Sequence, residues 1–281
     1  MDKKKKIIIA VGFLAALIAV YFIYQNLLFI STDNAQVQAR TVMLSAKVPG
    51  YVTKVNVEEN QKVKAGDVLV EIESRDYDNN LKQISNEMQG LTARMSDSEK
   101  NYHRIQNLFK QGAVSQQQLD TAQAAYNEVS HKHEALEAQV SQAQLNLEYA
   151  KVKAPSDGII ARKAVEQGML APVGAPLIGF VSSEERWIVA NFKETEMRDI
   201  KIGNKVEILI DAYPGKTFSG HVASWSAATG ATFTLLPPDN ATGNFTKVVQ
   251  RVPVKIVFDS LKAQDIDSLQ AGLSAEVKVR K

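Results

Sequence analysis

KVPGYVTKVNVEENQKVKAGDVLVEIE, residues 47–73, is the stretch of the chain that decides its fold. Its apolar and polar residues alternate, many of its side chains are β-branched, and Pro49-Gly50, Asn60 and Gly66 interrupt the alternation. This pattern predicts short strands joined by tight turns. Because so few strands cannot bury a stable core by themselves, we expect a matching segment elsewhere in the chain.

A second copy of the pattern is KAPSDGIIARKAVEQGMLAPVGAPLIGFV, residues 153–181. A shift of 108 positions superposes the turn residues of the two copies in pairs: Gly50 with Gly158, Asn60 with Gly168, and Gly66 with Gly174. Asparagine and glycine are the residues that best tolerate a positive φ angle. We therefore predict that both copies make the same left-handed turn, and that the second copy is the missing half of the domain.

These two segments resemble the two halves of a biotinyl/lipoyl carrier domain. In such carriers the halves meet at a tight hairpin that presents a modified lysine. Here the first half continues into SRDYDNN, residues 74–80, which contains no lysine. We therefore predict that the chain is not an enzyme's carrier subunit and that it holds no cofactor.

Residues 74–151 have the periodicity of two helices instead of a short hairpin. In each helix apolar residues recur at alternating spacings of three and four, with one polar member. The first set is Leu81, Ile84, Met88, Leu91, Met95, Ser98, Tyr102, Ile105 and Phe109; the second is Leu119, Ala122, Tyr126, Val129, His133, Leu136, Val140, Ala143, Leu147 and Ala150. A seven-residue repeat predicts an antiparallel coiled-coil hairpin. Each helix should have about 35 residues and a length of roughly 50 Å.

The tip of this hairpin is predicted near residues 111–116. Gly112 is placed to end the first helix, and Ser115 with Gln118 forms a capping-box sequence for the second. Pairing the heptad positions across the hairpin puts Ser98 opposite His133, a polar layer that could fix the register. Simple solvation of the two side chains near the seam is the open alternative.

Three residues around the tip carry a more specific signal. Arg104 and Leu108 are four residues apart and lie off the apolar seam, and Ser115 follows them. This Arg-x3-Leu-x6-Ser pattern resembles the tip motif of periplasmic adaptor proteins, also called membrane fusion proteins (HlyD family), of Gram-negative efflux pumps. The resemblance implies that the three residues contact the periplasmic end of a TolC-like outer-membrane channel. An arginine on a solvated face, a leucine flanking the core and a serine that only caps are the alternatives.

The start of the chain predicts a membrane anchor. The basic residues 1–6, MDKKKK, should form a cytoplasmic tail, and residues 7–30 are almost entirely apolar and long enough to cross a hydrocarbon core of roughly 30 Å. We therefore expect a single-pass inner-membrane protein whose bulk is periplasmic. A cleaved signal peptide is the rival interpretation, but its apolar region is usually shorter and is followed by a small-residue cleavage site.

The remaining sequence predicts a small β-barrel made of residues 31–45 and 183–281, because several short strand patterns are separated by turn signals. KETEMRDIKIGN, residues 193–204, is interpreted as a short helix ending at Gly203. The split lipoyl-like domain then comprises residues 46–73 and 152–182. The loop from Leu235 to Asn244 could face the transporter or simply connect strands. The expected fold is α+β with one N-terminal transmembrane helix.

Two long segments of the barrel region, residues 188–222 and 229–256, resemble the C-terminal part of EmrA-type adaptors. That resemblance implies a periplasmic adaptor for multidrug efflux and antibiotic resistance that partners a major-facilitator exporter and assembles as a ring of about six copies. A type I secretion adaptor serving an ABC transporter is an alternative, and so is an envelope coiled-coil scaffold without transport. The transported substrate is left open.

Composition excludes several other functions. The chain has 281 residues, a net charge of +2 and no cysteine. Balanced charges argue against nucleic-acid binding, and the lack of cysteine excludes disulfides and thiolate metal sites. His131 and His133 are two apart and so point to different faces of their helix, which argues against a metal site. No catalytic motif organises the serines, histidines and carboxylates, and we predict that the chain is not an enzyme.

Overall fold

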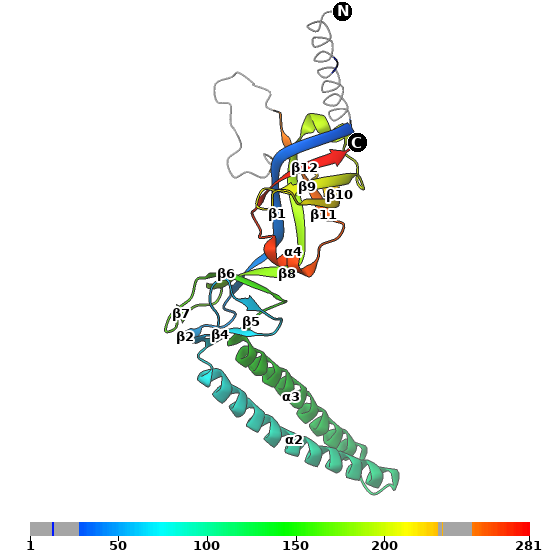
Figure 1. Ribbon diagram of the computed structural model, residues 1–281. Coiled ribbons are helices and arrows are strands. Elements are labelled where there is room, and N and C mark those ends of the chain that lie inside the picture. Colours follow the sequence, from blue (N-terminus) through cyan, green and yellow to red (C-terminus); the bar gives the residue numbers. More distant parts are fainter. Residues whose placement is uncertain (1–12, 14–27, 230–231, 233–248) are drawn as a thin grey trace, which may run out of the picture. The chain divides into compact units, whose positions relative to one another are not determined.

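The computed structural model describes residues 13, 28–229, 232 and 249–281, which form two compact units (Figure 1). One unit contains the described residues up to Arg40 together with Ser182–Lys281, and the other is Thr41–Val181. The predicted basic tail, most of the predicted anchor and the loop from Leu235 to Asn244 lie outside the described residues. Among the described helices, none is long and apolar enough to span a membrane.

The second unit begins with the split β-sandwich. Its strands are β2 (Gly50–Val55), β3 (Lys62–Val63), β4 (Val68–Ile72), β5 (Lys151–Lys153), β6 (Gly158–Lys163), β7 (Leu170–Ala171) and the start of β8 (Pro176–Lys193). One sheet has the order β5-β4-β2-β7, while β3, β6 and β8 pair in the other. Both halves contribute to one core, which includes Leu69, Ile72, Ile160, Leu177 and Phe180. The two halves therefore share a single core.

Backbone hydrogen bonds join the two halves, and two of these bonds occur at equivalent positions of the sequence repeat. The Asn60 N–H donates to the Ile160 carbonyl at 2.7 Å, and the Gly168 N–H donates to the Val52 carbonyl at 2.8 Å. These two bonds are related by the shift of 108 positions found in the sequence. Asn60 and Gly168 have φ angles of 66° and 85°, so both copies make the predicted left-handed turn. The sandwich therefore has an approximate twofold symmetry in its backbone as well as in its sequence.

Gly50 and Gly158 need a correction, because they are not turn residues. They begin β2 and β6, and neither has a positive φ angle. A Cβ atom on Gly50 would lie 2.6 Å from Ile72 Cγ2, and one on Gly158 would lie 2.3 Å from Phe180 Cζ. Close packing against the opposite strand, not backbone conformation, requires glycine at both positions. Gly66 and Gly174 do occupy turns, with φ angles of 85° and 84°.

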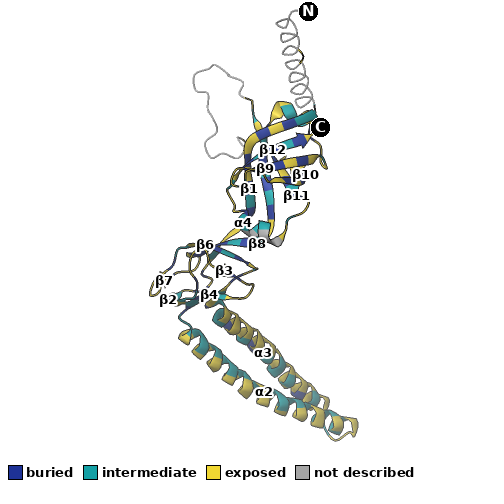
Figure 2. Cartoon of the chain, in the orientation of Figure 1, coloured by how far each residue is buried: buried dark blue, intermediate teal, exposed yellow. Residues whose placement is uncertain are grey.

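The helical hairpin consists of α2 (Arg75–Lys110) and α3 (Gln116–Tyr149), with 36 and 34 residues. Every residue of the two predicted apolar sets is at least partly buried. The seam is nevertheless shallow, since no residue of α2 is fully buried and only Ala122, Leu136 and Ala143 of α3 are (Figure 2). At the base of the hairpin, a side-chain hydrogen bond from Arg75 lowers the pKa of Glu73.

The register of the hairpin differs from the prediction. The rings of Tyr102 and Tyr126 stack with centroids 5.9 Å apart, and His133 Nε2 lies 3.1 Å from Thr92 Oγ1. His133 therefore pairs with Thr92, and the proposed layer of Ser98 with His133 is wrong. Heptad positions alone allow the two helices to slide by one layer, whereas the length of the tip fixes the layer that forms.

The other unit is a β-barrel. Its strands are β1 (Phe29–Ser45), β8, β9 (Lys205–Ile210), β10 (Thr217–Trp225), β11 (Arg251–Phe258) and β12 (Ser274–Arg280), in the order β1-β12-β9-β10-β11-β8, and β8 also pairs with β1. Ile188, Phe192, Ile208 and Ile256 are fully buried in its core. β1 and β8 each continue into both units, and the division falls after Arg40 and after Val181.

Two short helices complete the barrel, a 3-10 helix η1 (Glu194–Asp199) and α4 (Ala263–Ser268). The predicted helix before Gly203 thus ends earlier than expected. Ile200 follows it in an extended conformation and is buried, which places its side chain in the core instead of continuing the helix.

Candidate functional site at the hairpin tip

The end of α2 at the tip is fixed by backbone geometry. The Gly112 N–H donates to the Phe109 carbonyl and the Ala113 N–H donates to the Leu108 carbonyl, each at 2.9 Å. Gly112 has a φ angle of 72°. These two bonds and the left-handed glycine form a Schellman motif, which satisfies carbonyl groups that the end of a helix leaves without partners.

The start of α3 is fixed by a complete capping box. Ser115 Oγ accepts a hydrogen bond from the Gln118 backbone N–H at 3.3 Å, and the Ser115 N–H donates to Gln118 Oε1 at 3.0 Å. Only four residues separate the end of α2 from Ser115. The tip is therefore a short connection with both of its ends capped, and it can present side chains in defined positions.

The three motif residues lie within this capped tip region. Arg104 is exposed and makes no ion pair with any described residue, and Leu108, one turn later, is half-buried. Ser115 is exposed although its hydroxyl takes part in the cap. The tip thus places a guanidinium, part of an apolar side chain and a hydroxyl near one end of the hairpin.

We expect Ser115→Ala to destabilise the first turn of α3 by about 1 kcal/mol, because it removes the hydroxyl that accepts from Gln118. Ser115→Asn should keep most of this stability, since asparagine caps as well as serine. Amide hydrogen exchange of residues 116–119 in the full chain measures the difference. Equal exchange rates in the alanine variant and the wild type would contradict a stabilising cap.

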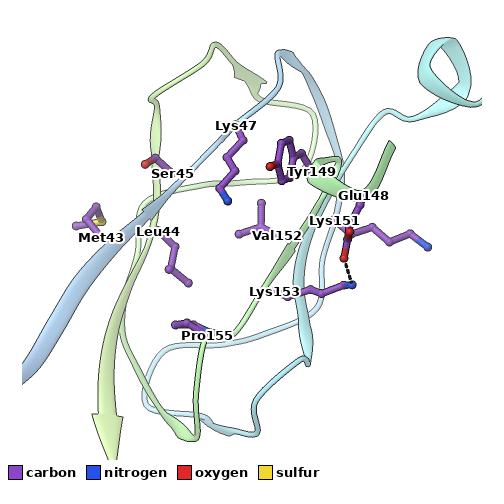
Figure 3. Close-up of a pocket in the computed structure, with 10 residues that line it drawn as sticks. All are labelled: Met43, Leu44, Ser45, Lys47, Glu148, Tyr149, Lys151, Val152, Lys153 and Pro155. Atoms are coloured by element: carbon purple, nitrogen blue, oxygen red, sulfur yellow. Dashed lines mark hydrogen bonds and ion pairs between the residues drawn. The ribbon is translucent and has the colours of Figure 1, made fainter. Parts of the chain in front are cut away.

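A pocket of about 490 Å³ lies where the two halves of the sandwich begin (Figure 3). Four of its lining residues come from the first half, and four come from the second half at the positions that the same shift of 108 superposes on them. The lining comprises Met43, Leu44, Ser45 and Lys47, then Lys151, Val152, Lys153 and Pro155, together with Glu148 and Tyr149. Lys47 Nζ lies 4.6 Å from the centre of the Tyr149 ring, and Lys153 Nζ lies 3.0 Å from Glu148 Oε1. Sequence reasoning missed this pocket because it forms only when the two copies meet.

The histidines of α3 take separate partners. His131 Nδ1 lies 3.4 Å from Glu134 Oε2, while His133 contacts Thr92. In the part of the chain that the structure describes, no group of three or more His, Cys, Asp or Glu residues is arranged to hold a metal ion.

A split lipoyl-like sandwich, interrupted by a helical hairpin and followed by a β-barrel, defines the class of membrane fusion proteins. A family model described as "RND MFP, barrel-sandwich hybrid domain" matches residues 40–181, and one described as "CusB-like, beta-barrel domain" matches residues 186–234. The membrane fusion protein Spr0693 from Streptococcus pneumoniae R6 has a similar fold, with a TM-score of 0.63 and 18% identity; the match covers 89% of this chain and 97% of that one.

Two relatives define the branch more closely. Colistin resistance protein EmrA of Acinetobacter baumannii is 33% identical over 94% of this chain and 90% of its own length. Multidrug export protein EmrA of Haemophilus influenzae is 32% identical over 99% of this chain and 84% of its own. The chain belongs to the membrane fusion protein family, in its EmrA-type branch of periplasmic adaptors. Members of this family are adaptors and not enzymes.

Proposed function

We propose that the chain is the periplasmic adaptor of a multidrug efflux pump, linking an inner-membrane exporter of the major-facilitator type to a TolC-like outer-membrane channel. Family membership supports the role of adaptor, and the capped tip with Arg104, Leu108 and Ser115 is the observation that carries the contact with the channel. In this proposal residues 7–30 anchor the chain in the inner membrane with its N-terminus in the cytoplasm. About six copies form a ring, and the partner supplies the energy for transport.

Cysteine crosslinking in intact cells tests the contact with the channel, because the natural chain contains no competing thiol. Ser115→Cys is combined with single cysteines at the periplasmic end of the candidate channel. Gln89→Cys, exposed on α2 away from the tip, is the control. Crosslinks to Ser115→Cys alone are expected. If neither position reacts while both proteins are well expressed, end-on docking is wrong and an envelope scaffold becomes the better explanation.

The class of exporter needs a separate test. The tagged full chain is crosslinked in cells and purified, and the captured membrane proteins are identified by mass spectrometry. We expect a multi-span permease without a nucleotide-binding domain. Capture of an ATPase transporter would instead assign the chain to type I secretion, the alternative considered from the sequence.

A further inference from the structure

One end of the β-barrel lies where the predicted membrane anchor ends. The Lys281 N–H donates to the Leu28 carbonyl at 2.9 Å, and Phe29, the first residue of β1, pairs with Arg280 of β12 (Figure 1). Because the paired strands run antiparallel, the starts of β1, β9 and β11 lie together with the ends of β8, β10 and β12. We call this part of the unit the anchor end of the barrel.

The exposed large apolar side chains of the barrel gather at its anchor end. Among the described residues of this unit that follow Leu28, these side chains are Ile202, Trp225 and Val249, which are 64%, 43% and 48% exposed. Ile202 lies in the turn before β9, Trp225 ends β10, and Val249 lies just before β11. We call these three residues the apolar rim. Exposed apolar residues that gather in one place usually mark a surface that contacts another molecule or a membrane.

Hydrogen bonds hold the turn that carries Ile202 in place. The Gly203 N–H donates to the Val222 carbonyl at 2.8 Å, and Asn204 Nδ2 donates to the Arg280 carbonyl at 2.7 Å. Gly203 has a φ angle of 89°, which glycine adopts without strain. Isoleucine is not one of the residues that usually form turns, and here its side chain packs against little of the barrel. The fold therefore displays this apolar side chain without needing it for its core.

Exposed cations accompany the apolar rim. Lys201 is in the same turn, Lys205 begins β9, and Arg280 ends β12. All three are exposed, and none makes an ion pair with a described residue. Asp199, the acidic residue closest to the turn in sequence, is paired with Lys281 at 3.7 Å. Tryptophan and aliphatic side chains beside lysine and arginine are typical of surfaces that lie on a bilayer, where the cations contact anionic headgroups.

We propose that the anchor end of the barrel rests on the membrane surface, with the apolar rim at the boundary between headgroups and acyl chains. Lys201, Lys205 and Arg280 then contact anionic lipid headgroups. This inference rests on the membrane anchor of the proposed function. Phe29 and Ile30, the last residues of the predicted anchor, already pair with β12 as part of β1, so no linker separates the anchor from the barrel. The anchor therefore brings this end of the barrel to the bilayer.

The two tryptophans of the chain serve as probe and control for this contact. The full chain is reconstituted into vesicles of phosphatidylethanolamine and phosphatidylglycerol whose acyl chains carry bromine, which quenches tryptophan fluorescence at close contact. Trp187→Phe leaves Trp225 of the apolar rim as the probe. Trp225→Phe leaves Trp187, six residues before the end of β8 and so roughly 20 Å from that end along the strand. We expect the brominated lipid to quench Trp225 and to leave Trp187 unchanged.

The possible outcomes separate the contact from the anchor, because flotation of the vesicles after an alkaline wash measures anchoring independently. If the chain stays with the vesicles and Trp225 is not quenched, the anchor stands, the lipid contact is wrong, and the exporter becomes the expected partner of the rim. Quenching of both tryptophans would place the side of the barrel on the bilayer and overturn the proposal. A chain that washes off the vesicles overturns both the anchor and the contact.

A charge substitution in the rim gives a second measurement, made in the chain that carries Trp187→Phe. Ile202→Asp should lower the quenching of Trp225 by about twofold or more, because binding at a bilayer surface depends on apolar burial and on attraction to anionic lipid. Thr217→Asp adds the same charge at the start of β10, the opposite end of that strand, and should leave the quenching unchanged. Both side chains are exposed, so neither substitution disturbs the core. Equal quenching in the two variants would overturn the proposed contact.

Discussion

Gly158→Ala is expected to destabilise the split lipoyl-like domain by about 3 kcal/mol. The added Cβ would lie 2.3 Å from Phe180 Cζ and 2.5 Å from the Val181 carbonyl oxygen. Phe180 is fully enclosed in the core, and a backbone carbonyl cannot turn aside as the end of a flexible side chain can. The strand must therefore move, which weakens the packing of both halves. Urea unfolding of the full chain in detergent, followed by far-UV circular dichroism, measures the loss.

The symmetry-related variant is a matched control for this prediction. At Gly50 the added Cβ would meet Ile72 Cγ2 at 2.6 Å, while the nearest backbone atom is 3.6 Å away. Because a side-chain methyl group can move more easily than a backbone carbonyl, Gly50→Ala should cost less, about 1 kcal/mol. Equal losses at the two positions would mean that the clash with the Val181 carbonyl is not what limits Gly158.

Gly90→Ala is expected to change the stability in the opposite direction from Gly158→Ala. Gly90 lies inside α2, and apart from its neighbours in the helix backbone no atom lies within 4 Å of a Cβ added there. Alanine should therefore stabilise the helix by about 0.5–1 kcal/mol, since it loses less backbone entropy on folding. Urea unfolding of the full chain measures the change, and a loss of stability in this variant would contradict the prediction.

The hairpin shows which features of the fold the sequence could predict. The heptad pattern selected only residues that are at least partly buried, because the same apolar seam that creates the pattern is what packs. It did not identify the register: the pattern is equally satisfied when the helices slide by one layer, and the pairing of His133 with Thr92 depends on the tip between them. The local periodicity determines which face of each helix packs, and the tip that connects the helices determines which of their residues lie opposite each other.

The sandwich shows a second limit of sequence reasoning. The internal repeat predicted the left-handed turns at Asn60 and Gly168 correctly, since only a few residue types accept that conformation. It assigned Gly50 and Gly158 to turns as well, because a shared glycine does not reveal whether backbone conformation or close packing requires it.

The predictions for the candidate site at the tip are also of two kinds: some depend only on the local sequence, and others depend on a partner protein. Gly112, Ser115 and Gln118 have the local roles that the sequence predicted, because capping depends on residues that are close together in the chain. The docking role of Arg104, Leu108 and Ser115 depends on a partner, and it therefore stays a prediction. Its strongest test is a substitution that changes the surface of the tip without changing the hairpin.

Arg104→Asp is expected to reduce efflux to the level of cells that lack the adaptor. Arg104 is exposed and has no ion-pair partner among the described residues, so reversing its charge should leave the hairpin folded. At the proposed contact with the channel, the reversal replaces an attraction with a repulsion, which costs several kcal/mol, and about 1.4 kcal/mol already lowers affinity tenfold. Accumulation of a fluorescent efflux substrate in intact cells measures the result.

Arg94→Asp separates a docking defect from a general effect of charge on the hairpin. Arg94 is also an exposed arginine of α2, but it lies ten residues before Arg104, roughly 15 Å farther from the tip along the helix axis. The control should export normally, and Arg104→Asp should also lose the crosslink between Ser115→Cys and the channel. Normal export by Arg104→Asp would eliminate Arg104 as a docking residue. Equal losses in both variants would instead indicate that the charge of the whole hairpin surface matters, because docking at the tip predicts a steep difference between two arginines of the same helix.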